Sequence, residues 1–112
     1  MTDHDDILTV SSADTFVECG DGWFPLLRRL DSALRNIDPN YEALQVKEKF
    51  GTLRFYASTI GLDEDASSQF HKLIADAEGE SARTCETCGQ PGSLRNDRRW
   101  LKTLCDAHAA TR

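Results

Sequence analysis

Two closely spaced pairs of metal-ligating side chains constrain this chain more than any other feature. Cys85 and Cys88 form the first pair, Cys105 and His108 form the second pair, and sixteen residues lie between the two pairs. A two-residue gap is too short for an ordinary structural disulfide, but it lets both side chains turn towards one ion. The spacing therefore predicts one Zn²⁺ per chain. Because four protein ligands close the tetrahedron, we expect a structural zinc with no open position for catalysis.

The residues around these pairs predict a finger over residues 83–112. Gly89 follows the second cysteine and permits the tight turn of a zinc knuckle over 84–92. A strand at 93–95, a turn at Asn96 and Asp97 and a strand over 98–104 would form a hairpin. A helix that starts near Cys105 would then carry the last two ligands on one face. Knuckle, hairpin and helix together describe a treble-clef-like zinc finger.

Hydrophobic periodicity predicts an α+β body over residues 15–82. Apolar residues at three- and four-residue spacing from Trp23 to position 37 predict an amphipathic helix, with Asp21 as its cap. Alternation predicts two strands, near 44–47 and 53–57, joined by a loop at 48–52. A second helix is expected over 63–81. The fold class is therefore α+β, a helix–β-hairpin–helix core followed by the finger.

The first residues differ from the rest of the chain. Residues 1–14 are charged and rich in serine, which predicts a flexible acidic tail, and residues 15–19 favour a short strand or an extended lead-in. The acidic start is unlike a signal peptide, and no apolar run approaches the ~20 residues that cross a bilayer. We therefore expect a soluble, cytoplasmic protein without a membrane partner.

Charge is distributed unevenly along the chain, whose net charge is −6. The finger holds six basic side chains against three acidic ones, a net charge of +3, and the remainder holds seven against sixteen, a net charge of −9. Such an acidic body disfavours broad nucleic-acid affinity, which depends on neutralising phosphates. It suits a basic protein partner, and solubility alone would also explain it.

Two clusters combine aromatic and basic side chains, one at the hairpin loop and one in the finger. Seven of their residues are candidates for partner binding: Lys47, Lys49, Phe50, Arg95, Arg98, Arg99 and Trp100. Phe50 could be an exposed anchor, as Tyr56 could, or it could pack against the first helix. Trp100 could contact nucleic acid with the arginines, or it could fill the core of the finger while the arginines are solvated or pair with the acidic body.

The sequence offers few residues that could carry out catalysis. A His-Asn-His-type nuclease needs histidines for water and for a catalytic cation, but the zinc uses His108 and leaves His4 and His71. Cys19 could act as a nucleophile with His71 as its base, or could replace His108 as the fourth ligand; a buried structural thiol explains it more simply. The sequence therefore predicts no catalytic residue and a protein that is not an enzyme.

Several segments together resemble a group of small uncharacterised bacterial and bacteriophage proteins. They are Gly22-Trp23, the block Val-Lys-Glu-Lys-Phe-Gly-Thr-Leu-Arg-Phe-Tyr at 46–56, Ala77-Glu78, Ser81, and the segment 85–108 with Pro91-Gly92 and Trp-Leu-Lys-Thr-Leu-Cys at 100–105. The similarity covers roughly residues 20 to 108. It implies a bacterial or phage origin and supplies no activity and no catalytic roles.

Small acidic proteins of that setting are often inhibitors, such as immunity or anti-defence proteins, whose acidity matches a basic target surface. The functional expectation is therefore a non-enzymatic zinc protein that binds and regulates or inhibits another macromolecule, namely a basic protein. The alternative is a nucleic-acid-binding regulator that uses the basic finger.

Overall fold

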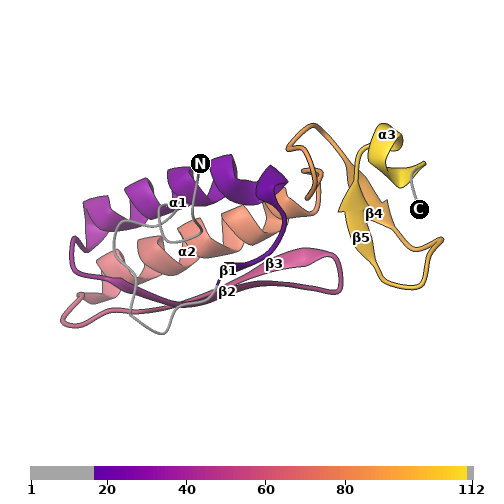
Figure 1. The fold of residues 1–112 in the computed structure, drawn as a ribbon. Helices are drawn as coiled ribbons and strands as arrows, with labels where there is room; N and C mark the ends of the chain where they lie inside the picture. The colour runs from indigo at the N-terminus through magenta and orange to yellow at the C-terminus, as the bar shows by residue number, and fades with distance from the viewer. Residues whose placement is uncertain (1–16, 111–112) are drawn as a thin grey trace.

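Two helices cover one face of a three-stranded sheet, and a small lobe of two strands and a short helix lies at one end of this body (Figure 1). The computed structural model describes residues 17–110. The tail expected at 1–14 therefore lies outside the described residues. The arrangement confirms the expected α+β class.

Helix α1 (Phe24–Ile37) follows a 3₁₀ turn at Asp21–Trp23. Pro25 lies in the first turn, where a missing N–H costs little. The expected cap is wrong, because Asp21 lies inside the 3₁₀ turn and the helix starts without a side-chain cap. Asp31 is buried within this helix and accepts a hydrogen bond from the hydroxyl of Tyr41.

The sheet has the order β1 (Val17–Glu18), β2 (Glu42–Lys49), β3 (Thr52–Ser58). Strand β1 runs parallel to β2 and β3 runs antiparallel to it, with a bulge between Ala43 and Gln45. The predicted loop at 48–52 is wrong, because pairing continues to Lys49 opposite Thr52. Two residues remain in the turn, Phe50 with φ 56° and Gly51 with φ 87°, and positive φ at both positions matches a type I′ hairpin.

Helix α2 (Glu64–Ser81) fills the expected range and is capped by Asp63, whose carboxylate accepts the N–H of Ala66. Its last turns also protect the outer edge of β3. The Ser81 hydroxyl accepts the N–H of Leu53 at 2.9 Å, and the Glu78 carboxylate accepts the N–H of Phe55 at 3.0 Å. Side chains of α2 thereby bond edge groups that could otherwise pair with another strand.

The core lies between the two helices and the sheet. Its largest fully buried members are Trp23, Tyr41, Phe70, Leu27, Leu34, Leu53 and Val46. None of the helices between residues 17 and 110 is long and apolar enough to cross a membrane.

The finger lobe contains β4 (Ser93–Arg95), β5 (Lys102–Leu104) and α3 (Asp106–Ala109). Its helix starts directly after Cys105, as expected. The hairpin differs from the prediction, because the connection runs from 96 to 101 and the second strand has only three residues. Arg98, which was expected in that strand, instead turns its guanidinium to the carbonyl oxygen of Ala109 at 2.7 Å.

Candidate metal centre and binding surface

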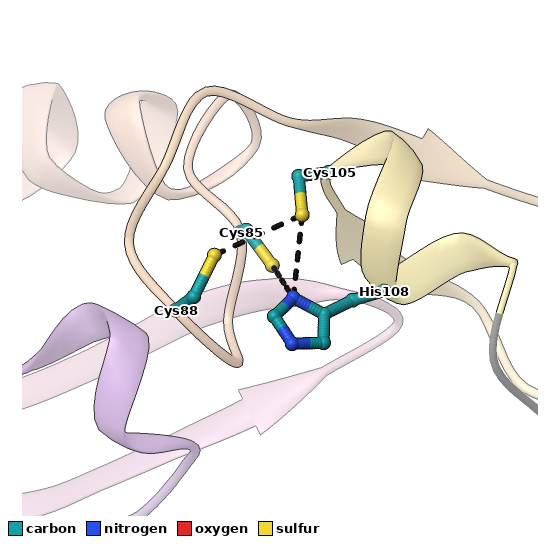
Figure 2. Close-up of side chains that lie close together, drawn as sticks. All are labelled: Cys85, Cys88, Cys105 and His108. Atoms are coloured by element: carbon teal, nitrogen blue, oxygen red, sulfur yellow. Dashed lines mark hydrogen bonds between the residues drawn. The ribbon is translucent and has the colours of Figure 1, made fainter.

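The four predicted ligands come together between the knuckle and α3 (Figure 2). Their ligand atoms all lie within 4.8 Å of one another. Cys105 Sγ lies 3.3 Å from His108 Nδ1, Cys85 Sγ lies 3.7 Å from the same nitrogen, and Cys88 Sγ lies 3.8 Å from Cys105 Sγ. The three cysteines of this cluster are free thiols. The arrangement can hold one metal ion.

Backbone geometry prepares the knuckle for this role. The N–H of Gly89 donates to the carbonyl oxygen of Cys85 at 2.9 Å, and the N–H of Cys85 donates to the carbonyl oxygen of Gln90 at 2.8 Å. Gly89 has φ 83°, a backbone conformation that residues other than glycine rarely adopt. The expected turn after the second cysteine is therefore confirmed.

The surroundings of two sulfurs favour the thiolate that a metal requires. Burial acts to raise the pKa of Cys85, but N–H groups of Cys105, Cys88 and Thr87 outweigh it and lower that pKa to about 6. The N–H of His108 lowers the pKa of Cys105. Negative charge is thus stabilised on these two sulfurs. The N–H of Gln90 acts to lower the pKa of Cys88, but desolvation and the neighbouring thiols outweigh it, so that this pKa is instead raised.

The knuckle is also joined to the start of α1. Gly22 donates its N–H to the carbonyl oxygen of Glu86 at 2.8 Å, and Trp23 Nε1 donates to the carbonyl oxygen of Thr84 at 2.9 Å. A Cβ atom at Gly22 would overlap the carbonyl oxygen of Cys85. Only glycine permits this close approach, so the body and the metal centre pack as one unit here.

Glu86, which lies between the first two ligands in the chain, continues this junction. Its carboxylate accepts the N–H of Gly20 at 2.9 Å and lies 3.6 Å from Lys102 Nζ. Lys102 also donates to Glu48 of strand β2 at 3.2 Å. The sequence pattern does not single out Glu86 or Glu48, and the available signal for Glu86 is its position between two ligands.

The finger also contacts the turn of the β2–β3 hairpin. The buried hydroxyl of Thr103 donates to the carbonyl oxygen of Gly51 at 2.7 Å, and Glu48 accepts the N–H of Gly51 at 2.7 Å. A Cβ atom at Gly51 would lie 2.5 Å from Leu94 Cδ1 of β4. The turn is thus held by contacts on its own strand and on the finger.

Two large aromatic side chains at this contact point into solvent. Phe50 is 64% exposed and Trp100 is 70% exposed. Both line one hollow of about 290 Å³, which we call the tip surface and whose residues are Glu48, Lys49, Phe50, Trp100, Leu101 and Lys102. The expectation that Trp100 fills the core of the finger is therefore wrong, as is the burial of Phe50 on the first helix.

Only some of the predicted cations remain available to a partner. Arg95 bonds the Leu104 carbonyl and Asp106, and Arg98 bonds Asp97, so both arginines pair within the finger and not with the acidic body. Arg99 is exposed, and Lys49 lies 5.5 Å from the centre of the Phe50 ring. The structure brings Lys49, Phe50 and Trp100 together and uses Arg95 and Arg98 internally.

The surroundings of Cys19 and His71 do not support a nucleophile with its base, and those of Cys19 do not support a fourth metal ligand. Cys19 packs against the core and is not one of the four clustered ligands. Burial raises its pKa to about 12, with further contributions from Glu86 and Asp21. The ring of His71 is exposed and its Nδ1 lies 2.8 Å from the carbonyl oxygen of Ser67 on its own helix. A neutral, half-buried thiol is a poor nucleophile.

Comparisons of this chain with protein-family models, with curated proteins and with solved structures found no match.

Proposed function

We propose that this chain is a non-enzymatic, zinc-stabilised binding module whose macromolecular partner docks on the tip surface. The observation that carries the proposal is the joint exposure of Phe50 and Trp100 over one hollow. Fifty positions separate these residues in the sequence, and each comes from a separate hairpin. Exposed aromatic side chains that converge in this way are the common anchors of macromolecular interfaces.

Ligand chemistry and spacing support zinc. A tetrahedral ion with Zn–S bonds of about 2.3 Å separates its sulfurs by about 3.8 Å and separates sulfur from nitrogen by about 3.5 Å. Three of the six separations between ligand atoms, 3.8, 3.7 and 3.3 Å, are close to these values, and all six lie within 4.8 Å. Three soft thiolates and one imidazole favour zinc over magnesium or calcium.

The order of parts in the finger supports a treble-clef-like assignment. A knuckle carries Cys85 and Cys88, a short hairpin follows, and the start of α3 carries Cys105 and His108. With all four positions taken by the protein, the ion has a structural role. We infer that it stabilises the finger and thereby presents Trp100 beside Phe50.

The backbone at Phe50 also supports a binding role. A bulky side chain at φ 56° costs about 1–3 kcal/mol, and the first position of such turns favours Asn, Asp or Gly. An exposed aromatic ring does not repay this cost by burial. Binding of a partner would explain why the ring is present.

The charge around Phe50 and Trp100 changes which kind of partner is expected at the tip surface. Glu48, the acidic residue of the tip surface, is already bonded to Gly51 and Lys102. Lys49 and Arg99 are exposed at or next to this surface. The local charge therefore favours an anionic partner, and the basic protein expected from the net charge of −6 stays a prediction for other faces.

Capture experiments with matched variants test the proposal. The zinc-loaded chain, the double variant Phe50→Ala/Trp100→Ala and the control Ile60→Ala would be immobilised and exposed to a bacterial lysate and to its nucleic-acid fraction. Ile60 is 94% exposed and lies between β3 and α2, at the other end of the hairpin. We expect the control to retain the bound macromolecules and the double variant to lose them. Equal retention by all three proteins would refute the tip surface as the docking site.

A further inference from the structure

We propose that the tip surface and the adjoining outward face of the sheet bind a single-stranded nucleic acid. This inference rests on the proposed function and specifies its partner. Bases would stack on Phe50, Trp100 and Tyr56, and the phosphates would lie against the cations between them.

Strand register places a row of basic and aromatic side chains on one face. Val46 and Phe55 point into the core, so their neighbours in each strand point to the opposite face. Lys47 pairs with Arg54 across the two strands, and Gln45 pairs with Tyr56 one step further from the turn. The same face therefore carries Lys47, Arg54 and Tyr56 and leads towards Lys49 and the turn.

The row is long enough for several nucleotides. Tyr56 is 48% exposed, and it lies four positions after Thr52 in the strand, a distance of about 14 Å. Phe50 follows Lys49 at the turn, and Trp100 lines the same hollow as these two residues. Exposed aromatic rings at intervals along a basic surface are the usual stacking sites for unpaired bases.

The cations along this row make few ion pairs with acidic side chains of the described residues. Between residues 17 and 110, the ion pairs involve neither Lys47, Lys49, Arg54 nor Arg99. Arg54 Nε is moreover buried without a hydrogen-bond partner among the described residues. Glu18, opposite Lys47 in the parallel register, and Glu42, opposite Ser58 at the far end of the hairpin, are acidic residues on this face. The balance favours phosphate locally, although the whole chain is acidic.

A single strand fits this surface better than a duplex. Bases in a duplex are stacked on one another, so Phe50 and Trp100 could not reach their faces. Four cations are also few for duplex binding against a chain with a net charge of −6. An acidic peptide would satisfy the cations but would leave the aromatic rings without matching flat partners.

Fluorescence anisotropy on the zinc-loaded full chain tests the inference. A labelled oligothymidylate, an oligouridylate and a matching duplex would be titrated at about 50 and about 200 mM salt. We expect single strands to bind more tightly than the duplex, with a log–log salt slope of about −2 to −3 for up to four phosphate contacts. Phe50→Ala and Trp100→Ala should each weaken binding about 5- to 100-fold. The control Arg28→Ala, at an exposed position of α1, should leave affinity unchanged.

A second readout does not depend on how well alanine variants fold. Trp23 is fully buried and Trp100 is 70% exposed, so the added strand should quench mainly Trp100. Trp100→Phe keeps a stacking ring and should retain most of the affinity while losing that quenching. Thermal unfolding and zinc content of each variant would be measured beside the titrations.

Three results would overturn the inference: no oligonucleotide binding at the lower salt, affinity that Phe50→Ala and Trp100→Ala leave unchanged, or equal binding of polyglutamate at the same surface. The proposed function fails separately. Suppose that the parent chain captures a protein, that Phe50→Ala/Trp100→Ala does not, and that oligonucleotides do not bind. The docking site is then supported and the nucleic-acid partner is refuted.

Discussion

The buried hydroxyl of Thr103 donates a 2.7 Å hydrogen bond to the carbonyl oxygen of Gly51, and so joins the finger to the turn of the β2–β3 hairpin. On its other side, the carbonyl oxygen of Thr103 accepts the N–H of Glu86 at 3.0 Å. A short chain of contacts therefore links the metal-binding knuckle to the residue beside Phe50. The conformation of the tip surface depends on that chain.

Replacing Thr103 with valine tests this link. Valine keeps the shape but leaves a buried carbonyl oxygen without this donor, so we expect a loss of about 1–3 kcal/mol in the free energy of unfolding. Thr52→Val is the control, because the Thr52 hydroxyl is exposed and makes only a 3.3 Å contact with the Lys49 carbonyl. Urea unfolding would measure both variants. A Thr103→Val protein as stable as the parent would contradict a structural role for the Thr103 hydroxyl.

Metal removal should reach beyond the finger. Chelation, or Cys85→Ser, is expected to unfold residues 84–108, because metal binding and folding are coupled in such sites. Trp23 would lose its hydrogen bond to the Thr84 carbonyl, and its fluorescence emission should shift to longer wavelength.

Cys19→Ser is the matched control for that experiment, since Cys19 lies outside the ligand cluster. It should retain one zinc per chain by elemental analysis, whereas Cys85→Ser should not. Protein purified without chelator that carries far less than one zinc would contradict the metal assignment.

Phe50→Asn should separate stability from binding. Asparagine tolerates positive φ, so the variant should gain about 1 kcal/mol in the free energy of unfolding. It should also lose partner binding, because the ring is gone. Phe50→Ala is the comparison: it removes the ring and keeps an unfavourable φ, so binding falls without that gain. A destabilised Phe50→Asn protein would show that the ring supports the fold.

Tyr41 predicts an alkaline limit to stability. Burial, and then the hydrogen bond to Asp31, raise the pKa of Tyr41 above its ordinary value near 10. The folded chain therefore keeps this proton above about pH 10, while the unfolded chain releases it. The contribution to stability is complete below pH 10 and is lost above it, at about 1.4 kcal/mol per pH unit.

Stability curves between pH 8 and pH 11 would check this slope. Tyr41→Phe should be less stable at neutral pH and should show a flatter decline above about pH 10. Tyr56→Phe, which alters an exposed ring, should follow the parent protein. Parallel curves for the parent and Tyr41→Phe would rule out the assigned role of Tyr41.

Several features could be predicted from neighbours in the chain. The spacing of Cys85, Cys88, Cys105 and His108 identified the ligand cluster, and periodicity located α1 and α2 within a few residues. The tight turn at Gly89 followed from its place after the second cysteine. These features depend on residues within a few positions of one another, and local propensity and ligand spacing encode them.

Local pattern was less informative where a distant segment decided the outcome. The tight turn at Phe50 and Gly51 is held partly by Thr103, more than fifty positions away. Asp31 has a polar side chain in a helix, yet it is buried because Tyr41 bonds it. The second strand of the finger hairpin has only three residues, and Arg98, which lies before it, donates to the carbonyl oxygen of Ala109.

The amino-acid sequence by itself determined the metal ligands, the two long helices and the approximate positions of β2 and β3, because these arise from spacing along the chain. Only the tertiary structure decided that Glu86 and Thr103 join the finger to the body, and that Phe50 and Trp100 emerge side by side. That outcome depends on how two lobes pack, and packing joins residues about 50 to 70 positions apart, a separation that no local periodicity records.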